Sequence, residues 1–337
     1  MLKIDEATEQ ILLKLAKDTG KVHIKSKDVM EEMRAQKLNI PEIVIKRICA
    51  ALNSGKHVIL TGAPGTGKTT LAKIIAKVAQ EKDAIFTTAS ADWSIGDTMG
   101  AYMPDIVDPR KLRFEAGIIL DSIISNSWII IDELNRTEID SCLGALFSLL
   151  SENEVELTYR SEITQNRIKV KIGDNQNEVD TFYMKSNWRM ISTMNYVDKN
   201  SVFEMSDALI RRFSVIPIDI PIDYDSLVDE WCTNSHIDRL IRDNLIEIVS
   251  QIKDKKIKQI GPAIVKDMIK YMECRREEDN EVIMHYSEAL VQLILPQLQG
   301  LESDEIENLD SIVQRCLKGN QEALQYYIDN LSLYAGL

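Results

Sequence analysis

The segment Gly-Ala-Pro-Gly-Thr-Gly-Lys-Thr at residues 62–69 has the residue types and the spacing of a loop that binds phosphate. It follows the apolar run 57–60 and precedes a helical pattern that starts at Thr70, which is the context this motif requires. Its glycines allow backbone N–H groups to approach phosphate oxygens, and a helix amino terminus adds partial positive charge. A chance glycine-rich loop is the alternative, and the complete pattern in this context disfavours it.

The loop predicts a nucleotide with its magnesium ion. We expect Lys68 to neutralise the β- and γ-phosphates and the Thr69 hydroxyl to ligate Mg²⁺. The residues expected to bind the nucleotide are Gly62, Ala63, Pro64, Gly65, Thr66, Gly67, Lys68, Thr69 and Thr70. The loop contacts no base, so the sequence leaves ATP and GTP open, with ATP the default.

A pair of acids follows a second apolar run, Ser-Trp-Ile-Ile-Ile at residues 127–131. Asp132 at the end of this strand is suited to hold Mg²⁺ through water, and Glu133 to orient and polarise the attacking water. The alternative is an ordinary Asp-Glu helix cap, which the complete phosphate loop in the same chain disfavours.

Two further polar sites lie near predicted strand ends. Asn195, which ends the apolar run 188–194, is suited to hydrogen-bond the attacking water or the γ-phosphate; the alternative is an asparagine in a turn. Arg211 and Arg212 precede the last predicted strand, and a planar guanidinium suits a phosphoryl transition state. Cations at a helix carboxyl terminus are equally common, so both interpretations of the arginines stand.

Apolar runs of strand length alternate with helical patterns along the first two thirds of the chain, which indicates a parallel sheet with both faces covered. The predicted strands are 57–60, 84–88, 127–132, 188–193 and 214–220. After Pro221 the apolar spacing is helical throughout. We expect a short helical N-terminal extension over 1–40, an α/β nucleotide-binding domain over 41–221 and a helical domain over 222–337. The polar tract 173–180 predicts the turn of a β-hairpin insertion.

Composition excludes some settings for this chain. It has 40 basic and 53 acidic residues, a net charge of -13, and no apolar run of about 18 residues. We expect no membrane span and no signal peptide. The five dispersed cysteines argue against disulfides and zinc and favour the cytoplasm. The acidic total argues against a general nucleic-acid coat and leaves a local basic channel open.

Taken together, these elements resemble the AAA+ superfamily, within the branch that contains MoxR-type chaperone ATPases and the McrB-type GTP-using restriction motors. The resemblance spans about residues 45–300. The segments that carry it are IDELNR at 131–136, FEAGIILDSI at 114–123, MSDALIRRFSVI at 205–216 and STMNYVDKNSVF at 192–203. On the McrB-type pattern, Asn195 and Asp198 fall on the motif's Asn and Asp.

The resemblance implies a homo-oligomeric ring, usually a hexamer, in which Arg211 or Arg212 reaches the neighbour's γ-phosphate. It also implies a β-hairpin within 100–114 that faces the pore or a partner; the alternative is a surface loop with Tyr102 and Phe114 packed on the body. Family members often carry a basic residue after Gly-Pro in the helical lid, where this chain has Ala263. Lys266 could replace it or be an ordinary solvated lysine.

We therefore expect an AAA+ NTPase: a P-loop α/β domain followed by a helical lid, using ATP or GTP with Mg²⁺. The leading hypothesis is the motor subunit of a McrB-like, DNA-directed defence system with a separate effector chain. Nucleic acid would be reached through a partner or the pore, and no membrane is expected. One alternative is a MoxR-like chaperone that remodels a protein partner. Another is a nucleotide-gated scaffold with little hydrolysis, which Glu133 and Asn195 argue against.

Overall fold

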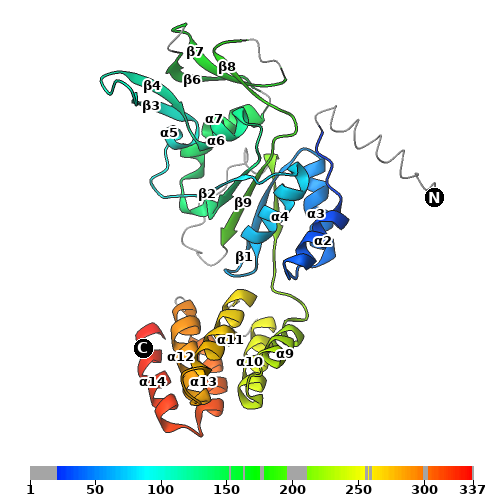
Figure 1. Ribbon diagram of the computed structural model, residues 1–337, viewed down its shortest axis with the longest axis vertical. Coiled ribbons are helices and arrows are strands. Elements are labelled where there is room, and N and C mark those ends of the chain that lie inside the picture. The colour runs from blue at the N-terminus through cyan, green and yellow to red at the C-terminus, as the bar shows by residue number, and fades with distance from the viewer. Residues whose placement is uncertain are drawn as a thin grey trace, which may run out of the picture. The chain divides into compact units, whose positions relative to one another are not determined.

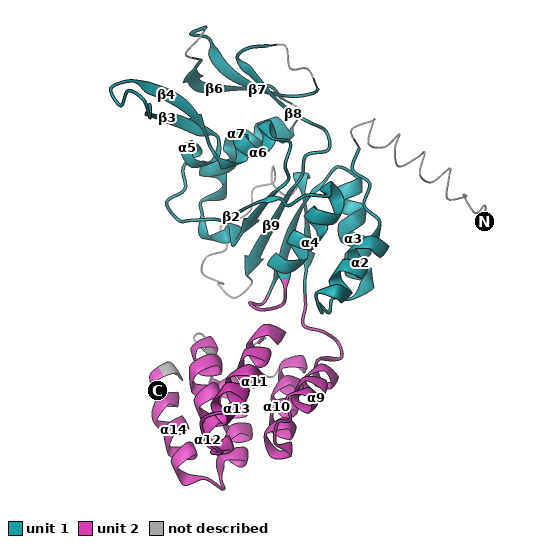
Figure 2. Cartoon of the chain, viewed as in Figure 1, with its two compact units in different colours: residues 1–62, 68–218 teal, residues 63–67, 219–337 magenta. Residues whose placement is uncertain are grey.

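A computed structural model describes residues 21–335, apart from 152, 162–163, 175–177, 196–210, 255–256, 258–259 and 299–302. The chain divides into two compact units (Figure 2). Unit 1 holds the described residues up to Gly62 and those from Lys68 to Ile218. Unit 2 holds Ala63–Gly67 and the described residues from Asp219 onward.

A five-stranded sheet forms the centre of unit 1, in the order β10-β1-β9-β5-β2, and every neighbouring pair is parallel (Figure 1). The strands are β1 (His57–Gly62), β2 (Ile85–Thr88), β5 (Ile129–Asp132), β9 (Met190–Asn195) and β10 (Phe213–Pro217). Each of the five predicted apolar runs overlaps one of them, and the ends differ by at most three residues. Strand β1 is buried along its whole length, which explains its continuous apolar run.

Helices cover both faces of this sheet, as alternate residues of β1 show. Val58 and Leu60 pack in one core with helices α2, α3 and α4, while Ile59 packs in a second core with α6 and α7. The helices are α2 (Ser26–Ala35), α3 (Glu42–Asn53), α4 (Lys68–Gln80), α6 (Ile118–Ile124) and α7 (Ile139–Leu150). The prediction of a parallel sheet covered by helices on both faces is confirmed.

Two insertions extend from this body at the end of unit 1 that is at the top of Figure 1. The first, after α5 (Ile95–Thr98), is the antiparallel hairpin of β3 (Gly100–Pro104) and β4 (Leu112–Ala116), where a hairpin was expected. The second is a sheet of β6 (Val155–Arg160), β7 (Arg167–Ile172) and β8 (Thr181–Met184). Strands β7 and β8 are parallel, so the prediction of a hairpin turn over 173–180 is wrong.

The two insertions are joined by aromatic side chains. The Tyr102 hydroxyl accepts from the Arg160 backbone N–H at 2.8 Å and lies 3.2 Å from the Arg160 carbonyl, to which it donates. Tyr159 contacts both Tyr102 and Phe114, with ring centroids 5.3 and 5.4 Å apart. Tyr102 and Phe114 therefore pack on the second insertion, while Ile106 and Val107 at the hairpin tip are 80% and 93% exposed.

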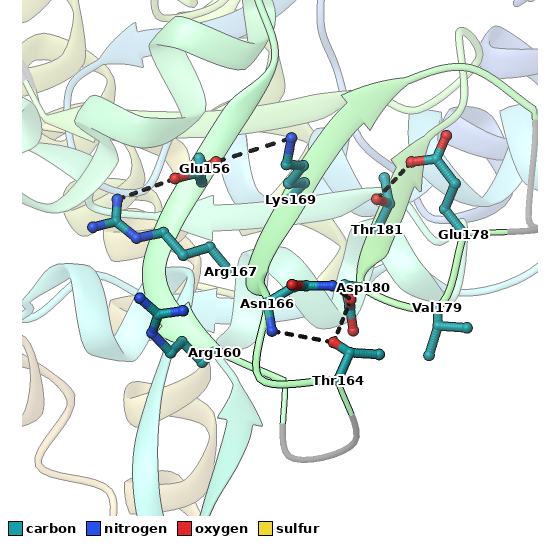
Figure 3. A pocket seen from close by; sticks show the side chains of 10 residues that line it. All are labelled: Glu156, Arg160, Thr164, Asn166, Arg167, Lys169, Glu178, Val179, Asp180 and Thr181. Carbon is teal, nitrogen blue, oxygen red and sulfur yellow. Dashed lines mark hydrogen bonds and ion pairs between the residues drawn. The ribbon is translucent and has the colours of Figure 1, made fainter.

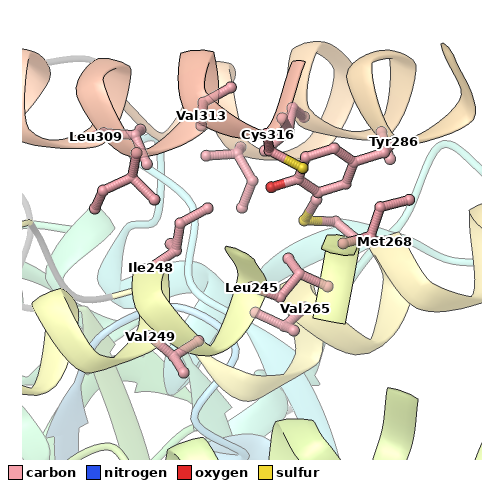
Figure 4. Close-up of a cluster of buried hydrophobic side chains, with 14 of the residues drawn as sticks. Leu245, Ile248, Val249, Val265, Met268, Tyr286, Leu309, Val313 and Cys316 are labelled. Atoms are coloured by element: carbon pink, nitrogen blue, oxygen red, sulfur yellow. The ribbon is translucent and has the colours of Figure 1, made fainter. Parts of the chain in front are cut away.

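Unit 2 contains, besides the short segment Ala63–Gly67, only helical elements among its described residues. They are α9 (Tyr224–Asn234), α10 (Arg239–Lys253), α11 (Pro262–Arg276), α12 (Val282–Ala289), short helical turns over 290–298, α13 (Ser303–Leu317) and α14 (Gln321–Ala335). Side chains of α10, α11, α12 and α13 meet in one apolar core (Figure 4). Inside it, the amide of Asn244 donates to the Ile312 carbonyl at 2.8 Å and accepts from the Tyr286 hydroxyl.

Two composition-based expectations can be compared with the structure. None of the described helices is long and apolar enough to cross a bilayer. All five cysteines are unpaired, and four of them are buried. The helical pattern expected within residues 1–20 lies outside the described residues.

A buried histidine joins β1 to β9. His57, 5% exposed, accepts a hydrogen bond at Nδ1 from the Met190 backbone N–H at 2.9 Å. Its ring also contacts the rings of Trp188 and Phe213. Burial lowers the pKa of His57 to about 3, and the charges of Arg189 and Lys56 act in the same direction. The histidine is therefore neutral in the fold.

This geometry predicts a loss of stability in mild acid. Because the pKa of His57 is lower in the folded chain than its ordinary value of about 6.5, the unfolded chain binds the extra proton below that pH. We expect the free energy of unfolding to fall by up to about 1.4 kcal/mol per pH unit between about pH 6 and pH 4 from this group alone. Denaturant unfolding of the wild type and of His57→Asn, which retains an acceptor, measures the difference. Equal pH slopes in the two proteins would contradict it.

Candidate active site

The carboxyl edge of the parallel sheet brings together three of the predicted site residues, Gly62, Asp132 and Asn195. Strand β1 ends at Gly62, β5 at Asp132 and β9 at Asn195. Gly62 and Asn195 are register partners, and β5 lies on the other side of β9. Because parallel strands end at the same edge, groups distant in sequence come together there.

The phosphate loop has backbone angles that its glycines make accessible. Gly65 and Gly67 have φ values of +75° and +87°, a region that other residues seldom adopt. The Thr66 hydroxyl donates to the Ala63 carbonyl at 2.9 Å and is buried. The loop leads into the amino terminus of α4, whose first residue is Lys68. A helix terminus of this kind attracts phosphate.

Lys68 is held inside the loop. Its Nζ donates to the Gly62 carbonyl at 3.0 Å, and the residue is 6% exposed. Burial lowers the pKa of Lys68 to about 8, while the nearby charges of Asp132 and Glu133 oppose that shift. The charges of both acids therefore act on the buried ammonium group.

Asp132 accepts two hydroxyl hydrogen bonds through the same oxygen. Its Oδ1 lies 2.7 Å from Thr69 Oγ1 and 2.5 Å from Thr193 Oγ1. Thr69 and Asp132 are half-buried oxygen donors in contact with each other, and this is the donor chemistry that Mg²⁺ prefers. Among the described residues there is no group of three or more His, Cys, Asp or Glu side chains that could hold a metal ion.

Glu133 adopts the left-handed backbone conformation, with φ 53° and ψ 46°. A non-glycine residue there is uncommon and is often found at functional sites. Its backbone N–H donates to Thr193 Oγ1 at 3.0 Å. One threonine hydroxyl therefore fixes Asp132 through its side chain and Glu133 through its main chain.

The Glu133 carboxylate has two partners. Oε2 forms an ion pair with Nε of Arg136, which ends the 3₁₀ turn η1 (Leu134–Arg136). Oε1 lies 3.5 Å from Nδ2 of Asn195, a long hydrogen bond. The structure thus brings Glu133 and Asn195 together, as their proposed roles on one water molecule require.

Arg211 and Arg212 lie elsewhere. They immediately precede β10, whose first residue, Phe213, is the register partner of His57 at the start of β1. At about 3.3 Å per residue, the five-residue length of the register places them roughly 16 Å from the loop edge of the sheet. The Arg211 carbonyl accepts from Lys56, and Arg212 Nε is buried without a hydrogen-bond partner among the described residues.

The sequence singled out three further residues, Asp198, Ala263 and Lys266. Asp198 lies outside the described residues. In unit 2, the Ala263 backbone N–H at the start of α11 donates to the Gly65 carbonyl at 3.2 Å. Lys266 Nζ lies over the Trp231 ring, 4.5 Å from its centroid. That cation–π contact within unit 2 engages Lys266 with an aromatic ring rather than with the phosphate loop.

Two residues of the site were not predicted. Thr193 appeared only as part of an apolar strand, although its place two residues before Asn195 could have drawn attention to it. Arg136 was visible three residues after Glu133, the spacing at which side chains meet on a helical turn. Neither was assigned a role because their partners depend on the folded arrangement.

A separate concavity of about 740 Å³ lies on the β6–β7–β8 insertion (Figure 3). Its charged side chains already have partners: Arg167 pairs with Glu156 at 3.1 Å, and Asp180 accepts from Thr164 and Asn166. The insertion is far from the loop edge in Figure 1. Because these side chains already bond one another within the surface, we assign the concavity no part in nucleotide chemistry.

Comparison with known proteins agrees with the geometry. Residues 57–213 match the family model described as the AAA domain of the dynein-related subfamily. That segment begins at β1 and ends at the first residue of β10, so it contains the complete parallel sheet apart from the rest of β10.

A curated relative is the type IV methyl-directed restriction enzyme EcoKMcrB subunit of Escherichia coli strain K12. It is 28% identical to this chain over 195 residues, which cover 54% of this chain and 39% of the relative. The similarity thus spans about two fifths of the relative's length. Residues 57–213 form an AAA+ domain that resembles McrB-type motors.

The contacts of Thr193 predict that its hydroxyl is needed. Thr193→Val keeps the shape but leaves the Glu133 N–H without its acceptor and removes one donor from Asp132, a loss of roughly 1–3 kcal/mol for a buried polar group. We expect a lower thermal midpoint and slower nucleotide turnover, with nucleotide affinity largely retained because the loop is intact. Thr193→Ser is the matched control and should restore both. Turnover of Thr193→Val at the wild-type rate would contradict this role.

Proposed function

We propose that this chain, which carries an AAA+ domain resembling those of McrB-type motors, hydrolyses the β–γ phosphate bond of ATP or GTP. One observation carries the proposal: Asp132 contacts Thr69 near the start of α4, Glu133 contacts Asn195, and the charges of both acids act on Lys68. A protein that only binds nucleotide does not need a carboxylate and an amide placed together, as Glu133 and Asn195 are, to act on a water molecule.

The groups divide the reaction between them. The loop N–H groups and Lys68 hold the phosphates, and Thr69 and Asp132 would hold Mg²⁺, which supplies charge neutralisation when bound. Glu133 accepts a proton from a water molecule that Asn195 orients. The water oxygen forms a bond to the γ-phosphorus as the bond to the β–γ bridging oxygen breaks, which gives the nucleoside diphosphate and phosphate.

The arginines imply that the site is shared between subunits. Arg211 and Arg212 lie at the opposite edge of the sheet from their own phosphate loop, so neither serves it from within the same unit. In a homo-oligomeric ring, which we take to be a hexamer, one arginine would instead approach the neighbour's γ-phosphate. Arg212 is the first choice, because it adjoins the buried Phe213 and has a buried Nε without a partner among the described residues.

The name of the curated relative supports a specific biological role. That protein is a restriction subunit, and on this basis we propose that the chain is the motor of a DNA-directed defence system with its effector on a separate chain. The ring would reach DNA through the effector or the pore, in keeping with the net charge of -13. A MoxR-like chaperone that remodels a protein partner is the alternative, and the similarity to the restriction subunit favours the first role.

A mixture of two inactive proteins tests the hydrolysis site and its sharing. Glu133→Gln keeps the shape but removes the base, and Arg212→Ala removes the proposed trans arginine; an arginine of this kind is worth about 10³- to 10⁵-fold in rate. We expect each variant to bind nucleotide yet turn over very slowly, and mixed rings to regain part of the activity. Phosphate release with ATP and with GTP, at matched total protein, measures both the recovery and the preferred nucleotide.

Two results of that mixture would count against the model. If Glu133→Gln hydrolyses at the wild-type rate, Glu133 is not the base. If both variants are inactive and the mixture remains inactive although mixed rings form by native mass spectrometry, the site is not shared through Arg212.

The effector role predicts a nucleotide-dependent partner. Tagged Glu133→Gln, held with its nucleotide bound, should retain from native-host lysate a chain that cleaves DNA, while tagged Lys68→Ala, which cannot hold the phosphates, should not. Identification of the retained chain by mass spectrometry, followed by a DNA-cleavage assay of the purified pair, measures this. Retention of a partner without DNA-cleaving activity would favour the chaperone alternative instead.

A further inference from the structure

We propose that Arg136 is a positioning residue that holds Glu133 in a resting pose and limits hydrolysis until the ion pair opens. The inference rests on the proposed function, because it concerns the base of that reaction. It is based on the contacts of the Glu133 carboxylate in the folded chain. The sequence motif by itself does not predict these contacts.

Both carboxylate oxygens of Glu133 are engaged in the structure. Oε2 is paired with Arg136 Nε, and Oε1 is 3.5 Å from Asn195 Nδ2. A general base must accept a hydrogen bond from the water it activates, with an oxygen about 2.6–3.2 Å away. Each carboxylate oxygen can accept more than one hydrogen bond, so these contacts do not exclude water. They hold the carboxylate toward Arg136 and Asn195, and it can turn toward a water in another direction only when the ion pair opens.

The backbone makes this pose a defined state of the turn. Glu133 has left-handed φ and ψ angles and donates its N–H to Thr193. The Arg136 backbone N–H donates to the Glu133 carbonyl at 2.9 Å, closing the turn that separates the two residues. Because the main chains of both residues are fixed, only rotation of a side chain can open the ion pair. The turn keeps Arg136 close to the carboxylate, so the pair can form again in each round of hydrolysis.

The exposure of the pair suits a reversible restraint. The Arg136 side chain is 62% exposed and that of Glu133 is 26% exposed. Ion pairs in contact with water are weak and are screened by salt, so this one would shift the resting and released populations by about two- to fivefold. A shift of that size slows basal turnover without blocking it, and a competing charge brought near the exposed guanidinium would remove it.

Charge removal at Arg136 tests the proposal in the intact 337-residue chain. Arg136→Gln should raise kcat about two- to fivefold at saturating nucleotide and leave KM unchanged. Wild-type kcat should rise with sodium chloride between 50 and 500 mM as the pair is screened, whereas kcat of Arg136→Gln should not. Arg136→Lys, which retains the charge, should stay close to the wild type.

Arg315→Gln is the matched control. Arg315 is also 62% exposed and pairs with Glu247 at 2.5 Å, but it lies in α13 of unit 2, outside the proposed machinery. It should alter neither kcat nor the salt response. Thermal midpoints of the three variants, compared with the wild type, show that the kinetic effects are not effects on folding.

The outcomes separate this inference from the proposed function. A lower kcat for Arg136→Gln would show that Arg136 supports the base and overturn the restraint, and an unchanged kcat and salt response would overturn it as well. In both cases the wild type would still hydrolyse nucleotide in a Glu133-dependent way. If instead the wild type shows no turnover, or Glu133→Gln turns over equally fast, the proposed function itself fails.

Discussion

A single hydroxyl group, that of Thr193, links the polar residues at the carboxyl edge of the parallel sheet. It donates to Asp132, which also accepts from Thr69 after the phosphate loop, and it accepts the main-chain N–H of Glu133. These hydrogen bonds join three segments that are distant in the sequence: the start of α4, strand β5 and strand β9. The left-handed conformation of Glu133 persists because this bond helps to hold it, and the direction of its side chain follows from that conformation.

Cationic and acidic side chains lie close together at this edge of the sheet. Burial disfavours the charged form of Lys68, and the two adjacent acids favour it. The ammonium group is therefore retained by its neighbours, and triphosphate oxygens would supply further negative charge around it. Arg136 adds a second cation on the solvent side of Glu133. The acids consequently have one buried and one exposed cationic partner, and only the exposed one is easily displaced by water and salt.

The sequence predicted the parts of this arrangement that depend on local pattern. The five strands, the phosphate loop and the acids at a strand end follow from apolar runs, glycine spacing and position, and the fold class was correct. Thr193 was not identified because its partners come from strands that are neighbours only in space, 61 residues away in the case of Asp132. The parallel pairing of β7 with β8 was missed for the same kind of reason, since a polar tract resembles a turn whichever way the next strand runs. The resting pair of Glu133 and Arg136 depends on a backbone angle that no residue pattern specifies.

The contact between Tyr102 and Arg160 gives the two insertions a mechanical property. Segments 58 residues apart are joined by two hydrogen bonds and a shared aromatic cluster. The hairpin that carries the exposed apolar tip at Ile106 and Val107 is therefore braced by the second insertion. The base of that support is tied to α7, because Thr98 donates to the Cys142 carbonyl at 2.6 Å. Helix α7 begins only six residues after Glu133. A force applied at the tip would therefore be transmitted through Thr98 to α7, which starts close in sequence to the turn that carries Glu133.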